Sequence, residues 1–524
     1  MSNMRISGLV SGMDTDAMVQ SMMKVERLKV DRYEQSKQIA LWRQEAYINT
    51  NKMFANFILN TQKDMGLKKA SSTGSLSNVS YSRLDYVRKA TSSNETAATV
   101  SATSEAVNGS YEIKVEKLAT NAKLNSNKVD KDQTFGNEIT INLGGNDIIV
   151  KNENGVKLSD IAKEINNSKQ GINAFFEVDS TNKGILFLQT SKTGEVQTIN
   201  LTATGSNSSE FLDLFTEKNA RGENSQIKFN GQTLNYNDNN IKFNGLNIQL
   251  KAEGVTNINV NTNVDGIMEK IEKFVNDYNE LIDKTSKLVS EKRYSNYHPL
   301  SQEEKKAMHE DDVKLWQEKA KSGMLNRDET IQRTLQNIRT DLYKNVEGLD
   351  GSFKHITEIG ITTEKYSKGT TGGKLQIDKD KLRAAIEKDP EGVMKLLFNE
   401  PDVKKDGMSE AEYKKAVSNK SGVFTRIYDN LTDGMKTIID KSGPGEDADL
   451  FRSVQFNILI DFRTKKSSIS DLDKEILDAN KKIDDLNAML YRKENAYYAK
   501  FANMEKMLSQ MNSQSKWLSQ QFMR

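Results

Sequence analysis

The sequence predicts a multidomain α+β protein, with an antiparallel helical or coiled-coil stalk formed by both termini and two β-rich head domains formed by the middle of the chain. Three observations lead to this prediction. Apolar residues recur every three or four positions near both ends, which is the helical period. Residues 71–263 instead alternate apolar and polar positions and are dense in Ser, Thr, Asn and Gly, as strands and turns are. The chain has no proline before Pro299 or after Pro444, so long uninterrupted helices are permitted at both ends.

The first element is a helix that we expect to begin at Asp14 and to end near Gly66. Asp14 and Thr15 are suitable N-caps, because a side-chain oxygen there can accept a hydrogen bond from the first turn. Apolar residues on this helix form a stripe that needs a partner helix. They are Met18, Met22 and Val25, followed by Ile39, Trp42, Ala46, Met53 and Phe57.

The middle of the chain is expected to form two β-rich domains, one inserted into the other. Short period-two runs mark the strands, and a helical stretch over 158–165 makes the inserted part α+β. The pentapeptide Ile-Lys-Phe-Asn-Gly occurs at 227–231 and again at 241–245, each time between apolar runs. Because Asn and Gly tolerate positive φ, each copy predicts a tight hairpin turn.

Helix is predicted to resume after Asn263 and to continue in several stripes up to a break at Gly443-Pro444-Gly445. Within this region Asn326, with Glu329 three residues later, indicates a variant of the capping box at a helix start.

The last segment is the most regular helix of the chain. Its seam advances in steps of three and four residues, the heptad pattern of a coiled coil. The seam consists of Ile469, Leu472, Ile476, Ala479, Ile483, Leu486 and Leu490. A four-residue stutter then shifts the phase to Tyr497, Phe501, Met504, Leu508 and Met511. If helix ran from Asp449 to the end, it would extend about 110 Å, too long for the core of a small globule.

These elements define the expected domains. Both ends of the polypeptide are expected to be mobile at their outermost residues. The segments are 1–35, a mobile N-terminal segment; 36–70 and 264–465, a helical stalk domain; 71–119 and 223–263, a β-rich head domain; 120–222, an inserted α+β head domain; and 466–524, a C-terminal coiled-coil helix.

The composition argues against an enzyme. The 524 residues include no cysteine and only three histidines, which removes disulfides, thiol nucleophiles and most metal-ligating side chains. The formal net charge is +2, so any surface for a polyanion would have to be local, and no nucleic-acid partner is expected. No apolar run approaches the length that spans a bilayer, and the N-terminus does not read as a secretory signal peptide.

Three motifs imitate functional sites, but each is better explained as ordinary surface structure, so no cofactor, metal or catalytic residue is expected. Residues 369–374 imitate a phosphate-binding loop but lack its first glycine and its Ser/Thr. Residues 402–413 imitate a calcium loop but carry Lys404 at a ligand position and Tyr413 in place of the final Glu. His298 and His309 lie near several carboxylates in a highly charged stretch, which favours a solvated surface.

Several segments together resemble one known family. They are Ile-Ser-Gly-Leu-Val-Ser-Gly-Met-Asp at 6–14, Phe-Val-Asn-Asp-Tyr-Asn at 274–279, Gly-Lys-Leu-Gln-Ile-Asp at 373–378, and Tyr-Tyr-Ala-Lys-Phe-Ala-Asn-Met-Glu at 497–505. These segments resemble the bacterial flagellar filament-capping proteins, also called flagellar hook-associated protein 2. The resemblance covers essentially the whole chain.

The resemblance implies a non-enzymatic, extracellular assembly factor. Such a protein is exported through the flagellar type III apparatus, forms a ring of about five subunits at the filament tip, and guides exported flagellin into the filament, which elongation and motility require. The implied partners are further copies of the chain, flagellin, the hook–filament junction protein and an export chaperone at the C-terminal helix, with no membrane insertion.

Apolar residues near the chain ends are the candidate assembly site. Two interpretations of them stay open, packing within the chain and contact with an assembly partner. They are Ile6, Leu9, Val10, Met18, Met22, Leu508, Met511, Leu518 and Phe522. Two other function classes also stay open: an extracellular adhesin or scaffold that binds host or surface ligands through the head domains, and a hydrolase within the β domains.

Overall fold

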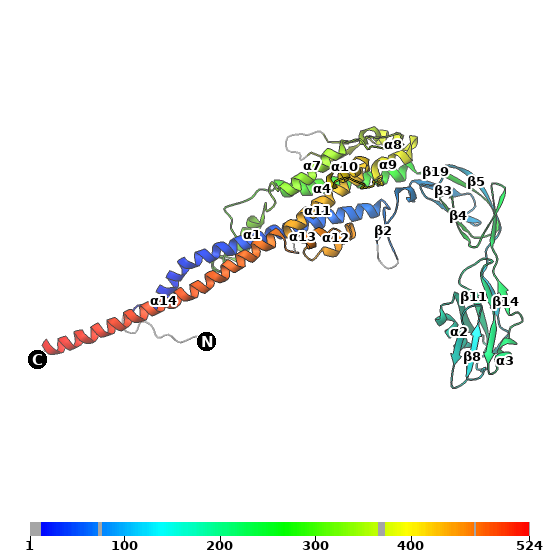
Figure 1. Ribbon diagram of the computed structural model, residues 1–524, viewed down its shortest axis with the longest axis horizontal. Coiled ribbons are helices and arrows are strands. Elements are labelled where there is room, and N and C mark those ends of the chain that lie inside the picture. The colour runs from blue at the N-terminus through cyan, green and yellow to red at the C-terminus, as the bar shows by residue number, and fades with distance from the viewer. Residues whose placement is uncertain (1–11, 72–75, 365–371, 466–467, 523–524) are drawn as a thin grey trace. The chain divides into compact units, whose positions relative to one another are not determined.

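The computed structural model describes residues 12–71, 76–364, 372–465 and 468–522 (Figure 1). The chain divides into two compact units, one of residues 1–77, 270–385 and 392–524 and one of residues 78–269 and 386–391. Helices dominate the first unit and antiparallel strands the second. The predicted α+β class, with helical termini and a β-rich middle, is confirmed.

The first unit is built around two long helices from the chain ends, α1 (Thr15–Asp64) and α14 (Asp471–Phe522). As predicted, Asp14 caps α1: its Oδ1 accepts a hydrogen bond from Ala17 N at 2.9 Å. The other helices are α4 (Val264–Ser290), α5 (Gln302–Ala307), α6 (Glu310–Lys321), α7 (Glu329–Leu342), α8 (Lys379–Lys388), α9 (Pro390–Phe398), α10 (Glu410–Lys420), α11 (Val423–Ser442), α12 (Ala448–Val454) and α13 (Ile460–Lys465). Two two-stranded sheets accompany them, β1 (Lys68–Ala70) with β2 (Leu76–Asn78), and β20 (Ile361–Thr363) with β21 (Leu375–Ile377).

Aromatic rings form the centre of this helical unit. Phe274 of α4 stacks on Phe424 of α11 with ring centroids 3.7 Å apart, and Phe57 of α1 lies 5.7 Å from Phe274. Tyr428 completes the cluster and donates its hydroxyl hydrogen to Thr61 Oγ1. These contacts tie α1, α4 and α11 into one core.

Two details of the helices differ from the sequence predictions. The C-terminal helix is not continuous from Asp449, because α12 and α13 precede α14 as separate helices. A new N-cap explains the restart, since Ser470 Oγ accepts from Asp473 N at 3.1 Å. The cap of α7 is Asp328, which accepts from Ile331 N at 3.0 Å, whereas the predicted Asn326 donates to the carbonyl oxygen of Glu291.

The second unit contains two β-rich cores. In the first, a five-stranded sheet in the order β16-β15-β5-β19-β3 accompanies a three-stranded sheet in the order β17-β18-β4. Its strands are β3 (Arg88–Ser92), β4 (Ala98–Ala102), β5 (Gly109–Lys117), β15 (Ser225–Phe229), β16 (Gln232–Tyr236), β17 (Asn240–Phe243), β18 (Leu246–Leu250) and β19 (Gly254–Thr262). Both predicted Asn-Gly hairpins are confirmed, because β15–β16 and β17–β18 turn through Asn and Gly residues with positive φ.

The second core is α+β and is formed by residues between β5 and β15. Its sheets have the orders β10-β11-β6, with β7 also on β11, and β13-β8-β9, and a separate pair is formed by β12 and β14. Its elements are β6 (Lys123–Asn125), β7 (Val129–Asp130), β8 (Glu138–Asn142), β9 (Ile148–Lys151), α2 (Leu158–Ser168), β10 (Ile172–Val178), β11 (Lys183–Thr190), β12 (Thr198–Asn200), β13 (Thr202–Gly205), α3 (Ser208–Leu212) and β14 (Asn219–Arg221). Each core has its own cluster of buried aliphatic and aromatic side chains.

Candidate assembly site at the end of the helical unit

Helices α1 and α14 pair in antiparallel orientation (Figure 1). Two polar contacts fix their register: Lys493 Nζ donates to Glu26 Oε1 at 2.6 Å, and Gln44 Nε2 donates to Asp473 Oδ1 at 2.7 Å. The same Gln44 amide also donates to the carbonyl oxygen of Ser442 at the end of α11, so it links three helices. The Lys493 ammonium lowers the pKa of the Glu26 carboxyl below its usual range.

An apolar cluster lies between the paired parts of the two helices. Its buried members are Val19, Met23 and Val30 of α1 with Ile483 and Leu490 of α14. Partly buried members are Leu486, Tyr497, Tyr498 and Phe501. Burial of such side chains contributes about 1.5–3 kcal/mol each before ordering entropy is subtracted, so this cluster is what holds the pair together.

Helix α14 continues beyond the start of α1. In the register set by Glu26 and Gln44, Thr15 lies opposite about residue 503 of α14. At 1.5 Å per residue the helix extends roughly 28 Å further, to Phe522. Every residue from 511 to 522 is exposed, so the described residues leave this end of α14 uncovered.

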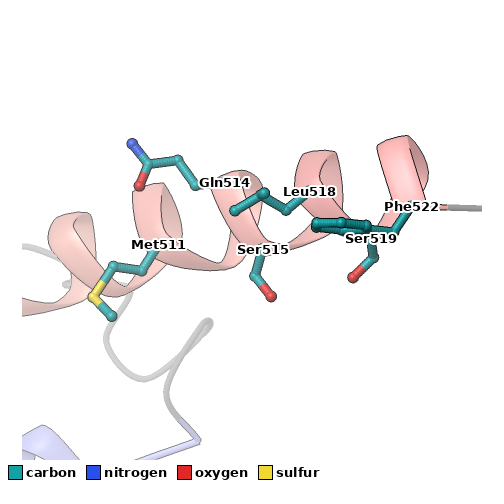
Figure 2. A pocket seen from close by; sticks show the side chains of 6 residues that line it. All are labelled: Met511, Gln514, Ser515, Leu518, Ser519 and Phe522. Carbon is teal, nitrogen blue, oxygen red and sulfur yellow. The ribbon is translucent and has the colours of Figure 1, made fainter.

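The overhanging part of α14 carries a continuous apolar stripe. We call it the terminal stripe, and it consists of Met504, Leu508, Met511, Leu518 and Phe522, with Ser515 at the intervening position. The steps are three and four residues, as in a coiled-coil seam. Phe522 is 86% exposed and Met511 63% exposed. Figure 2 shows Met511, Leu518 and Phe522 along α14, where they line a shallow hollow of about 500 Å³ together with Gln514, Ser515 and Ser519.

Beyond Met507, the surroundings of the terminal stripe are polar but nearly uncharged. Lys516 is the one ionisable side chain between Met507 and Phe522, and the remaining polar positions are Ser, Asn and Gln. Trp517 and Met507, both exposed, widen the apolar surface. A neutral rim around an apolar centre is the pattern of a protein–protein contact surface rather than of a site for an ionic ligand.

Helix α1 has a second apolar face near its start. Met18, Met22 and Val25 are exposed, although Val19 and Met23, one position later, are buried against α14. One position is about 100° around a helix, so the two sets lie on different faces. Residues 15–35 lie within α1, in agreement with the helix predicted from Asp14 onward, and their mobility stays a prediction.

The structure brings together only some of the predicted seam residues. Leu472, Ile483 and Leu490 are buried, Leu486 and Ile476 are half-buried, and Ile469 is exposed. On α1, Trp42 is buried and Ile39 is half-buried. Phe57 packs with Phe274 and Tyr428 in the helical core instead of against α14. Ile6, Leu9 and Val10 lie outside the described residues.

The sequence analysis missed Val19, Met23 and Val30, which form the α1 side of the buried cluster. Their spacing of four and seven residues, with Glu26 between them facing Lys493, is a helical signal. The parallel series Met18, Met22 and Val25 has an equally good period, and the sequence alone gives no reason to prefer either series.

The described residues of the phosphate-loop-like, calcium-loop-like and histidine motifs have ordinary structural partners. Lys374, from the loop-like stretch, forms an ion pair with Asp283 at 2.6 Å, whereas residues 369–371 lie outside the described residues. Lys405, in the calcium-like stretch, pairs with Glu410. His298 bonds Glu304 at 3.0 Å, and His309 is the N-cap residue of α6. Within the described ranges no three His, Cys, Asp or Glu side chains are grouped to hold a metal ion.

None of the helices described is long and apolar enough to cross a bilayer.

Comparison with known proteins gives consistent matches. The family models described as "Flagellar hook-associated protein 2 N-terminus" and "Flagellar hook-associated protein 2 C-terminus" match residues 11–122 and 222–513. Flagellar hook-associated protein 2 of Halalkalibacterium halodurans is 29% identical over 99% of this chain and 100% of its own length. The protein of that name from Escherichia coli K12 is 25% identical over 87% of this chain and 88% of its own length. The crystal structure of the flagellar cap protein FliD D1-D2-D3 domains from Escherichia coli has a TM-score of 0.50 at 21% identity, covering 74% of this chain and 96% of that one, a similarity of fold.

Proposed function

Because the chain belongs to the flagellar hook-associated protein 2 family, we propose that it is a subunit of the flagellar filament cap and that it docks at the filament tip through the terminal stripe of α14 and the outer face of α1. One observation carries the docking proposal: the last turns of α14 have a seam pattern but are exposed at every position from 511 to 522. The family is one of structural cap proteins and is not known for enzymatic activity.

The cap is expected to be an oligomer. A ring of about five subunits would present five copies of α14 to the filament, and head-to-tail contacts generate such a ring when the rotation between neighbours closes. The formal net charge of +2 over 524 residues gives little self-repulsion between copies. We propose that this ring guides exported flagellin into place, which supports filament elongation and motility.

The division into stalk and heads belongs to the same proposal. The helical unit would be the part that contacts the filament, and the two β-rich cores would be the heads. We also propose that the chain is exported through the flagellar type III apparatus and contacts the hook–filament junction protein. An export chaperone would bind the C-terminal part of α14. A chaperone would cover an apolar stripe that the free chain leaves exposed.

A triple substitution tests the docking surface. Leu508, Met511 and Leu518 are changed to Ser in the full chain, and binding to cap-free filament tips is measured with filament growth. If each side chain contributes at least about 1.5 kcal/mol when buried at the tip, binding weakens by about a thousandfold. The unfolding transition should stay in place, because these side chains contribute little to the folded core of the free chain.

A matched control carries Ser at Lys506, Lys516 and Gln520, exposed positions on other faces of the same helix turns. It should bind tips as the original chain does. Normal capping by the stripe variant would refute docking through the terminal stripe. Loss of folding in that variant would assign the stripe to a core within the chain. If the unsubstituted chain fails to cap filaments, the cap proposal itself is wrong.

A further inference from the structure

Methionine is concentrated at the two ends of this chain. Of its 19 methionines, 11 lie within residues 1–23 and 489–524, which are 59 of the 524 residues. The chain has no cysteine, so the thioether is its only oxidisable sulfur. Methionine is flexible and polarisable, which suits a surface that must fit an irregular partner.

Four of the terminal methionines are exposed in the described part of the chain. Met507 is 68% exposed and Met511 63% exposed, and Met18 and Met22 are exposed on α1. Figure 2 shows the Met511 thioether projecting from α14. By contrast, Met65, Met394 and Met435 are at most 2% exposed in the helical unit. The sites that meet a dissolved oxidant first thus include those of the proposed docking surface.

We propose that Met507 and Met511, together with Met18 and Met22, are oxidation sites at which a peroxide switches off docking of the subunit. The inference rests on the proposed function, since it concerns the same surface. A thioether sulfur attacks one peroxide oxygen, the O–O bond breaks and an S–O bond forms. The sulfur loses two electrons, and the departing hydroxide takes the proton and leaves as water.

The product explains the loss of docking. A sulfoxide oxygen is a strong hydrogen-bond acceptor, and burying it in an apolar contact without a donor is unfavourable. The neutral rim of the terminal stripe offers amide and hydroxyl donors only beside the apolar centre. Oxidation of Met507 and Met511 is therefore expected to weaken tip binding by about a hundredfold. The modification is reversible by methionine sulfoxide reductases.

The first experiment maps oxidation in the full chain. Limiting hydrogen peroxide is added, and peptide masses are followed with time. Met507, Met511, Met18 and Met22 should react first, with Met408, an exposed methionine outside the surface. Met65, Met394 and Met435 should react last. Once subunits are docked on filament tips, Met507 and Met511 should react more slowly than in the free chain. Equal rates for free and docked subunits would overturn the proposal.

The second experiment connects oxidation to docking. A variant with Leu at 18, 22, 507 and 511 keeps apolar volume but cannot form sulfoxides there. Its tip binding before peroxide is measured first and serves as its own reference. After peroxide, tip binding by the original chain should weaken about a hundredfold, whereas the variant should keep its own untreated binding. A Met408→Leu control should lose tip binding after peroxide as the original chain does. Treatment with the methionine sulfoxide reductases for both sulfoxide epimers should restore tip binding by the oxidised original chain.

The outcomes separate this inference from the proposed function. Full tip binding by the oxidised original chain would overturn the oxidation switch and leave the cap function standing. Equal loss in the four-leucine variant would place the sensitive group elsewhere and would also overturn it. Failure of the untreated original chain to bind tips would instead refute the proposed function.

Discussion

Replacement of Arg426 should lower the free energy of unfolding of the helical unit. This arginine is 1% exposed and lies at the start of α11. All five N–H groups of its guanidinium donate to main-chain carbonyl oxygens at 2.7–3.1 Å. The acceptors belong to Asp341, Lys344, Asn345, Ser418 and Asn419.

The position of these acceptors explains the use of a cation. Asp341 is in the last turn of α7 and Ser418 and Asn419 are in the last turn of α10, where carbonyl groups have no partner within the helix. The carbonyl end of a helix carries partial negative charge. One guanidinium therefore caps two helices at once and joins them to α11.

The magnitude follows from the number of bonds. At about 0.5–1.5 kcal/mol per hydrogen bond, the five bonds contribute about 2.5–7.5 kcal/mol. We expect Arg426→Met to lower the free energy of unfolding of the helical unit by about that amount. Arg426→Lys, with three donors in another geometry, should lose about half of it.

Urea unfolding followed by helical circular dichroism measures this loss, and hydrogen exchange at residues 341–345 and 418–421 locates it. Arg333→Met is the matched control, because Arg333 is exposed on α7, and it should change the unfolding free energy by less than about 0.5 kcal/mol. If Arg426→Met unfolds within that same margin of the original chain, capping by this guanidinium is not a source of stability and the reasoning fails.

Two further predictions concern pH and glycine. The Lys493 ion pair lowers the pKa of Glu26 below its ordinary value of 4.5, so its stabilisation of the α1–α14 pair is present above that value and is lost as pH falls through the folded-state pKa. After correction for the intrinsic pH dependence of exchange, the amides of residues 15–35 should lose protection as pH is lowered from about 7 to 3. Glu26→Gln should abolish this pH-dependent loss of protection, and an unchanged loss in the variant would contradict the prediction. In the β-rich core, Gly231→Ala should cost only the strain of positive φ, about 1 kcal/mol, since no atom lies within 4 Å of the new Cβ. Gly245→Ala should cost clearly more, because its Cβ would lie 2.4 Å from Ala106 N; thermal melting of the two variants compares them, and equal melting points would be the contrary result.

Local features of this protein were predictable from its sequence. The cap of α1 at Asp14 and both Asn-Gly hairpins were predicted correctly, because each depends on the conformational preferences of residues close together in the chain. The apolar residues of the terminal stripe were recognisable from their spacing of three and four residues, since that spacing is a property of one helix. The family was recognisable from segments spread over the chain.

The tertiary structure decided which of these patterns are buried. Val19 and Met18 belong to equally periodic series one position apart, and the choice between them was made by α14, more than 450 residues away in sequence. Likewise, Gly231 and Gly245 occupy identical pentapeptides, yet only Gly245 has Ala106 against it. Arg426 carries no sequence signal, because its acceptors are carbonyl groups that every residue has. A sequence fixes the period and the local conformation of each element, whereas burial, capping across helices and close approach depend on which distant elements come to lie beside it.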